Sequence, residues 1–175
     1  MTTIRSVTAL LVIALLAVSV AGCGEDEVLA ASGTIEVTAI DYGYVDLPPV
    51  VKAGSTFTLK NVSGTELHEF VALRLPDSET RTVEQLVADP ASLEALFPNV
   101  ATVVIAPPNE DGFAVEGTGV LTEPGRYAII CAIPTGADPG EYLAAAAEAE
   151  GGPPQVDGGV PHFVSGMYAE VTIVE

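Results

Sequence analysis

Short runs of strand-forming residues between turn signals limit the fold more than any other feature of this 175-residue chain. Residues 168–174 show the pattern clearly, because Ala169, Val171 and Ile173 alternate with polar neighbours at the period of a half-buried strand. The chain has 17 Gly and 13 Pro residues, which supply turns between such runs. Seven segments have strand character: residues 34–41, 56–61, 67–75, 101–106, 117–121, 126–133 and 168–174. They predict an all-β fold, an antiparallel sandwich.

Two segments carry helix signals instead, and we expect them to be short helical insertions in the sandwich. In residues 76–99, Thr82 followed by Gln85 forms a capping-box pattern at the start of a short helix. In residues 135–159, Asp138 and a following Pro precede an Ala-rich run with high helix propensity. The second insertion is expected to cover one end of the sandwich, with partner recognition as the alternative.

The N-terminal segment has the pattern of an export signal. An uncharged run of 14 residues, 7–20, follows Arg5 and is too short for a hydrocarbon core of about 30 Å. Val20-Ala21-Gly22-Cys23 resembles the lipobox of bacterial lipoproteins, in which the Cys receives the lipid. We therefore predict a lipoprotein signal peptide at 1–22, an acidic tether at 23–33 after lipidated Cys23, and the folded domain at 34–175. Ordinary secretion with cleavage nearby is the alternative.

Acidic residues dominate the charge of the chain, with 24 Asp and Glu against six Lys and Arg and a net charge of −18. A surface of this sign repels a phosphate backbone, so no nucleic-acid partner is expected. Six positive charges are also too few for an anionic-lipid patch, which leaves the lipid anchor as the only contact with the membrane. The acidic surface is expected to keep the protein soluble, with a docking face as the alternative.

Four side chains with soft or borderline-soft donor atoms stand out. They are the two histidines of the chain, the one cysteine outside the lipobox and the one methionine after the initiator: His68, His162, Cys131 and Met167. Taken singly, each has an ordinary structural explanation, such as a buried thiol or a methionine that fills the core. Two imidazoles, a thiolate and a weak thioether together are the ligand set of a blue copper site.

Three segments resemble the copper-binding segments of cupredoxins. Residues 125–134 (GRYAIICAIP) resemble the strand that leads to the copper Cys, and 161–168 (PHFVSGMY) resemble the His-(four residues)-Met ending of plastocyanin-like domains. Residues 67–71 (LHEFV) are similar to the strand with the first His. The resemblance covers residues 34–75 and 117–175. It implies a Greek-key cupredoxin β-sandwich holding one mononuclear type 1 copper ion, with His68, Cys131, His162 and Met167 as ligands.

The chain departs from cupredoxins in two places. Thirty residues, 132–161, separate Cys131 from His162, whereas most cupredoxins have only a few there. Glu69 follows the first His where many members have an Asn that ties the ligand loops together. The resemblance therefore implies that this tie is lost.

The resemblance implies an electron carrier and not an enzyme. We expect a protein tethered to the bacterial cell membrane, on its extracytoplasmic side, that carries single electrons between redox protein partners. The alternatives are a cupredoxin-like lipoprotein that binds or delivers copper or binds another protein, and an accessory domain of a larger respiratory complex. The sequence has no recognisable Ser-His-Asp arrangement and no Gly-rich phosphate loop.

Overall fold

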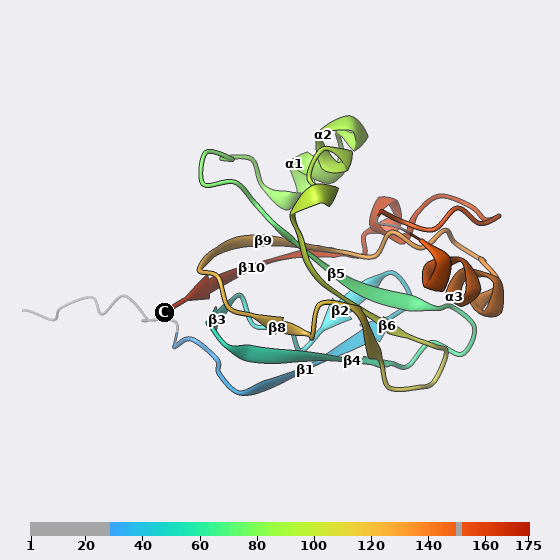
Figure 1. Ribbon diagram of the computed structural model, residues 1–175, viewed down its shortest axis with the longest axis horizontal. Helices are drawn as coiled ribbons and strands as arrows, with labels where there is room; N and C mark the ends of the chain where they lie inside the picture. Colours follow the sequence, from blue (N-terminus) through green and yellow to red (C-terminus); the bar gives the residue numbers. More distant parts are fainter. Residues whose placement is uncertain (1–28, 150–151) are drawn as a thin grey trace, which may run out of the picture.

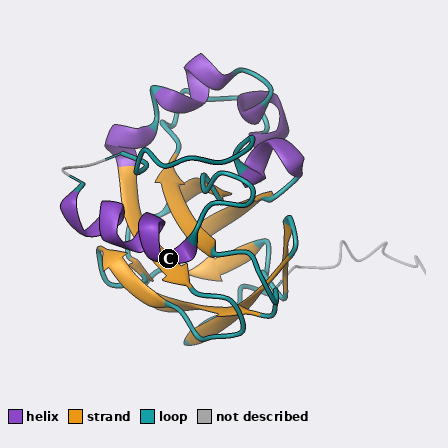
Figure 2. Ribbon diagram, turned by 90° about the vertical axis from the view of Figure 1, so that its right-hand side faces the viewer, coloured by secondary structure: helices purple, strands orange, loops and turns teal. Residues whose placement is uncertain are grey.

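The computed structural model describes residues 29–149 and 152–175, which form two β-sheets with short helices (Figures 1 and 2). The predicted signal peptide and the lipobox with Cys23 lie outside the described residues. Within these residues, no helix is both long and apolar enough to cross a membrane. The strands are β1 (Thr34–Ile40), β2 (Gly43–Val45), β3 (Val50–Lys52), β4 (Ser55–Asn61), β5 (His68–Arg74), β6 (Val100–Ala106), β7 (Phe113–Glu116), β8 (Val120–Leu121), β9 (Gly125–Ile130) and β10 (Tyr168–Val174).

The smaller sheet has four strands in the order β2-β1-β4-β8. Its apolar residues face the core at alternate positions, as in β1, where Ile35, Val37 and Ala39 are buried. β1 and β4 run parallel, while β2 and β8 pair antiparallel at the two edges. The end of β1 and the end of β4 therefore lie at the same end of the sandwich.

The larger sheet has six strands in the order β3-β10-β9-β5-β6-β7. β9 pairs antiparallel with both β5 and β10. The start of β5, the end of β9 and the start of β10 therefore lie at the same end of the sheet. The pairing of β10 with β3 is parallel. Both sheets are thus mixed, and the prediction of a purely antiparallel sandwich is corrected. The all-β sandwich with short helical insertions is confirmed.

Two hydrophobic cores lie on the two faces of the larger sheet. The main core fills the space between the sheets and includes Phe57, Leu59, Phe70 and Ile129. The second core lies on the outer face, which explains why six of the seven residues of β5 are buried. An alternating strand pattern would leave one face in water, whereas a strand covered on both faces is apolar throughout.

The first helical insertion covers this outer face. It contains α1 (Val83–Val87), α2 (Pro90–Glu94) and the 3₁₀ turn η1 (Phe97–Asn99), and α1 and α2 lie above β9 and β10 in Figure 1. The predicted capping box is present, because Thr82 Oγ1 accepts from the Gln85 N–H and Gln85 Oε1 accepts from the Thr82 N–H. Leu86 and Leu93 pack onto the sheet and complete the second core.

The second insertion contains α3 (Pro139–Glu148), which begins at the predicted cap, where Asp138 accepts from the Glu141 N–H. In Figure 1, α3 lies at the end of the sandwich where β5 begins. Its Tyr142 is completely buried in the main core. The 3₁₀ turn η2 (His162–Ser165) follows and leads into β10.

Several short elements differ from the sequence expectation. Of the predicted strand at 117–121, only residues 120–121 form a strand, β8, and the strands β2, β3 and β7 were not predicted. In the predicted tether, Ala31 already donates to the Val50 carbonyl and accepts from the Lys52 N–H. These hydrogen bonds place Ala31 beside the larger sheet.

Candidate metal centre

Three predicted ligands bring one donor atom each into a single cluster at the end of the sandwich. His68 opens β5, Cys131 follows directly after β9, and His162 opens η2. Their donor atoms all lie within 4.8 Å of one another. The His68 and His162 Nδ1 atoms are 3.2 Å apart, and Cys131 Sγ is 3.3 Å from His162 Nδ1. All three side chains are completely buried, so the cluster is shielded from water.

Met167, the fourth predicted ligand, is tied to two of the others through its backbone. Its N–H donates to the His162 carbonyl (3.1 Å), and its carbonyl accepts from the Cys131 N–H (3.2 Å). Gly166, which precedes it, has a φ of 110°, in the left-handed region that favours glycine. The side chain of Met167 is fully buried in the main core together with Cys131. The turn therefore holds the methionine beside the cluster, and its role as a ligand stays a prediction.

A neck of backbone hydrogen bonds closes the long segment between Cys131 and His162. The His162 N–H donates to the Ile133 carbonyl (3.0 Å), and the Phe163 N–H donates to the Cys131 carbonyl (2.9 Å). One step further out, Thr135 exchanges backbone hydrogen bonds with Val160 and Gly159. The 30-residue separation therefore does not pull the ligands apart, because this neck takes the place of a short loop.

Glu69 ties the ligand segments together, although many cupredoxins use an Asn at this position. The expectation that the tie is lost is therefore corrected. Its Oε1 accepts from the N–H of Ala132, next to Cys131 (2.9 Å), and its Oε2 accepts from the hydroxyl of Tyr142 (3.2 Å). The carboxylate is almost fully buried and links the strand of the first histidine to the cysteine segment and to α3. Sequence reasoning missed Tyr142, although a single aromatic residue in an Ala-rich helix was a usable signal.

Burial shifts the protonation of the donors. The pKa of His68 is lowered to about 4, mainly because burial disfavours the charged ring and then because His162 lies close by. Burial also lowers the pKa of His162. The pKa of the Cys131 thiol is raised well above its ordinary value by burial, against the effect of backbone hydrogen bonds from Glu69 and Ile133. Both imidazoles are thus neutral donors near pH 7, and the thiol must lose its proton to bind a metal.

The arrangement of the donors fits a metal ion. With a proton on each outward-facing Nε2, the Nδ1 lone pairs of His68 and His162 face each other across 3.2 Å beside the sulfur of Cys131. A shared proton could satisfy one pair of these atoms, whereas a single cation satisfies all three. Two imidazoles and a thiolate, with a methionine beside them, are the donor set of a type 1 copper ion.

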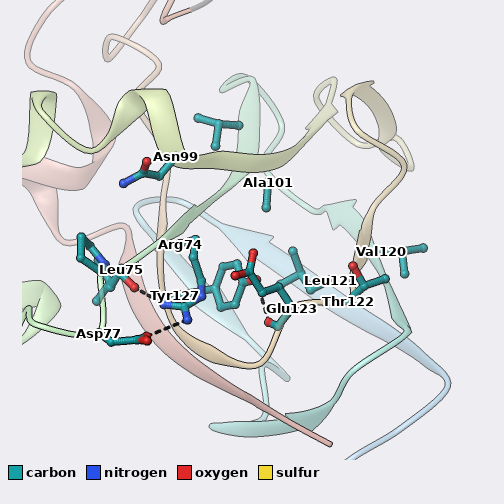
Figure 3. A pocket seen from close by; sticks show the side chains of 12 residues that line it. Arg74, Leu75, Asp77, Asn99, Ala101, Val120, Leu121, Thr122, Glu123 and Tyr127 are labelled. Carbon is teal, nitrogen blue, oxygen red and sulfur yellow. Dashed lines mark hydrogen bonds and ion pairs between the residues drawn. The ribbon is translucent and has the colours of Figure 1, made fainter.

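A cavity lies at the opposite end of the sandwich, where β5 ends and β9 begins. It has a volume of about 580 Å³. In Figure 3, Arg74 lies beside the ring of Tyr127, with Cζ 5.9 Å from the ring centroid, and pairs with Asp77 at 2.8 Å. The guanidinium is therefore already engaged by groups of the protein. This cavity has no cluster of metal donors among its lining residues.

The comparisons with known proteins find similarity among solved structures only. No family model and no curated protein matches the chain. It is similar to a dithionite-reduced auracyanin from the photosynthetic bacterium Roseiflexus castenholzii, at 18% identity and a TM-score of 0.46, over 83% of this chain and 100% of the other. It is also similar to auracyanin B (16%, 0.43, 84% and 92%) and to auracyanin A, a "blue" copper protein from Chloroflexus aurantiacus (19%, 0.42, 82% and 100%).

The roles of the site residues rest on the site itself. The sandwich brings the start of β5, the end of β9 and the start of β10 to one end, and the donors gather there. The two-sheet architecture and the His-Cys-His cluster confirm the resemblance to cupredoxins and fit one type 1 copper ion.

Proposed function

We propose that the protein is a membrane-tethered, extracytoplasmic type 1 copper protein that carries single electrons between redox protein partners and is not an enzyme. The observation that supports this most strongly is the convergence of His68, Cys131 and His162 in a fully buried cluster. In the proposal, His68, Cys131 and His162 would hold the ion, and Met167 would be a fourth, weaker ligand. Copper, when bound, supplies one-electron redox chemistry.

The residues of the chain would keep this site rigid and dry. The backbone neck fixes the separation of Cys131 and His162, and Glu69 fixes the segment after Cys131 to the strand of His68. A donor set held by the surrounding protein changes little in geometry when the charge of the ion changes. Small reorganisation is what an electron carrier requires, and enclosure in a buried site excludes water as a competing ligand.

The test is to load the purified full-length protein with Cu(II) and record its absorption spectrum. An intense visible charge-transfer band from thiolate to copper is expected, and its reversible loss on one-electron reduction supports an electron carrier. Bound copper without this band would reject the type 1 site and favour copper binding or delivery. A protein that binds no copper would contradict the proposal altogether.

The membrane tether and the extracytoplasmic location are supported by the sequence pattern that ends at Cys23. Replacing Cys23 by Ala should abolish incorporation of labelled lipid in cells, because the thiol is the acceptor. A Ser19→Ala variant, changed within the signal run, serves as the control and should still be labelled. Lipid incorporation that persists in Cys23→Ala would reject the anchor.

A further inference from the structure

Each of the two clustered imidazoles has a second nitrogen that faces away from the cluster and toward a carboxylate. His162 Nε2 lies 3.3 Å from Glu66 Oε2, and His68 Nε2 lies 3.7 Å from Asp41 Oδ1. Both Nε2 atoms are buried, and neither meets hydrogen-bond geometry with any group in the described part of the chain. The outer nitrogen of each ring therefore lies close to a carboxylate oxygen.

The position of the imidazole proton decides whether Nδ1 can bind a metal. A neutral imidazole has one proton, and Nδ1 has a free lone pair only when that proton is on Nε2. An acceptor beside Nε2 favours this tautomer, orients the ring and makes the ligating nitrogen more basic. In His162 the ring is also restrained by Tyr42, whose ring meets it edge-on at a centroid distance of 5.0 Å.

The two carboxylates are not equally suited to this role. Asp41 is 60% exposed and its oxygen is the more distant of the two, so water competes for it. The Glu66 side chain is only 16% exposed. Its Oε2 accepts from the Gly136 N–H at 3.1 Å, and its backbone carbonyl accepts from Asn61 Nδ2 at 2.8 Å. Glu66 is thus held on both sides while it faces His162.

We propose that Glu66 is a positioning residue for the metal centre, whose carboxylate keeps the His162 proton on Nε2 and leaves Nδ1 free for the metal. The proposal rests on the proposed function for the identity of the metal, but the geometry belongs to the chain alone. Gly136 lies in the 135–159 insertion, so its hydrogen bond to Glu66 makes the insertion part of the support of the site. The insertion therefore supports the site and does more than cover the end of the sandwich.

The test compares three variants of the full-length protein. Glu66→Ala removes the acceptor, and Glu66→Gln keeps an amide oxygen in the same place without the charge. Glu36→Ala removes an acidic side chain at an exposed position of β1 and serves as the control. The imidazole tautomers are read from ¹⁵N chemical shifts of the metal-free protein, which has only two histidines. Zn(II) affinity is measured by competition with a chelator, because Zn(II) accepts the same nitrogen and sulfur donors.

The wild type and Glu36→Ala should show His162 protonated at Nε2. Glu66→Ala should lose this preference and bind Zn(II) about 10- to 100-fold more weakly, the range for removal of such a supporting group. Glu66→Gln should keep the tautomer and show a smaller loss of affinity. A His162 tautomer that is kept in Glu66→Gln but lost in Glu66→Ala indicates that residue 66 positions the ring. A general effect on folding would also shift the His68 signals.

An unchanged His162 tautomer and an unchanged Zn(II) affinity in Glu66→Ala would overturn the proposal. If that variant does not fold, Glu66→Gln provides the test. A Zn(II) affinity of Glu66→Gln equal to that of Glu36→Ala would overturn the role of the Glu66 carboxylate. The two proposals fail separately. A wild type without a visible copper band defeats the type 1 assignment, yet a tautomer that depends on Glu66 would still establish the positioning role.

Discussion

The two ends of β5 and β9 place polar groups in opposite situations. At one end, His68, Cys131 and His162 are fully buried, and the outer nitrogens of both rings lack a hydrogen bond within the described residues. At the other end, Arg126 donates to both oxygens of Glu170 at 2.7 and 2.8 Å, and to two backbone carbonyls of the first insertion. One end thus leaves the donor atoms of two histidines and a cysteine facing one another, while at the other end the charge of Arg126 is paired within the protein.

The difference separates a binding function from a structural one. Burial of polar groups without partners opposes folding, so a chain that keeps such groups together at one place gains from a ligand that satisfies them. At the arginine end the charges of Arg74 and Arg126 are paired with Asp77 and Glu170, although Arg74 Nε is buried without a hydrogen-bond partner among the residues that the structure describes. Perturbing the first end should therefore change metal binding, whereas perturbing the second should change only stability.

The largest effect is expected for Cys131→Ser, which should abolish the visible band of the copper-loaded protein. The thiolate is the source of the band, and a hydroxyl is a poor substitute for it. The domain should remain folded, with a loss of about 1–3 kcal/mol for a buried hydroxyl with incomplete hydrogen bonding. Absorption spectra and denaturant titrations measure the two effects. The control Cys23→Ser removes the other cysteine and should keep the band, and an undiminished band in Cys131→Ser would reject the ligand assignment.

Acidification should weaken metal binding at the cluster of His68, Cys131 and His162 by about tenfold per pH unit. Binding releases one proton from the thiol of the cysteine. Burial raises the pKa of this thiol, so the proton is present over the whole range from pH 8 to pH 5. The pKa of His68 is lowered to about 4, so its protonation steepens the loss only near and below that pH. Chelator competition at several pH values gives the slope. A flat profile would show that the thiol is already ionised without metal.

Tyr142→Phe should destabilise the donor end by about 1–3 kcal/mol, because it leaves Glu69 Oε2 buried without its hydroxyl donor. The pKa of Glu69 is raised to about 7 by burial. The carboxylate is charged mainly above that pH, so the loss should be larger at pH 8 than at pH 5. Denaturant titration at both pH values measures it. Tyr168→Phe, at a half-buried position of β10, is the control, and an equal effect in both variants would contradict the role of the Tyr142 hydroxyl.

The smallest effect is expected for Glu170→Gln at the arginine end, at most about 1 kcal/mol, as for other solvent-accessible ion pairs. Arg126 lowers the pKa of Glu170 through hydrogen bonds, so the pair stabilises the fold above the ordinary carboxyl pKa. This contribution is lost as the pH falls through the lowered pKa. Metal affinity should not change. A loss of metal affinity in this variant would show that the two ends are coupled.

The long strands and the helix caps could be predicted from the sequence because their signals are local. The alternation in β10 and the capping box at Thr82 depend on neighbours within a few residues. The three-residue strands β2 and β3 are too short to show a period, and the parallel pairing of β1 with β4 depends on contacts remote in sequence.

The candidate site divides in the same way. The rarity of His, Cys and Met in the chain, together with the resemblance, pointed to His68, Cys131 and His162, whose donor atoms the fold gathers. It also pointed to Met167, whose role as a ligand stays a prediction. The supporting groups had no such signal. Glu66 is one of 24 acidic residues, and only the fold brings it to His162 and to Gly136 of a distant insertion. Likewise, the resemblance implied that the tie is lost at Glu69. Its partners Ala132 and Tyr142 lie more than 60 residues away in the sequence, so only the fold could identify them.

Complete enclosure of the donors has a consequence for kinetics. An ion in solution can reach side chains with no exposed surface only while the surrounding chain is locally open. The neck between residues 133–135 and 159–162 is a candidate place for such an opening, because its hydrogen bonds join the segment after Cys131 to the segment that holds His162. The rate of metal uptake should then level off at high metal concentration, where opening becomes the slow step. The same barrier would delay release, so that a loaded molecule exchanges its ion slowly even with a strong chelator present.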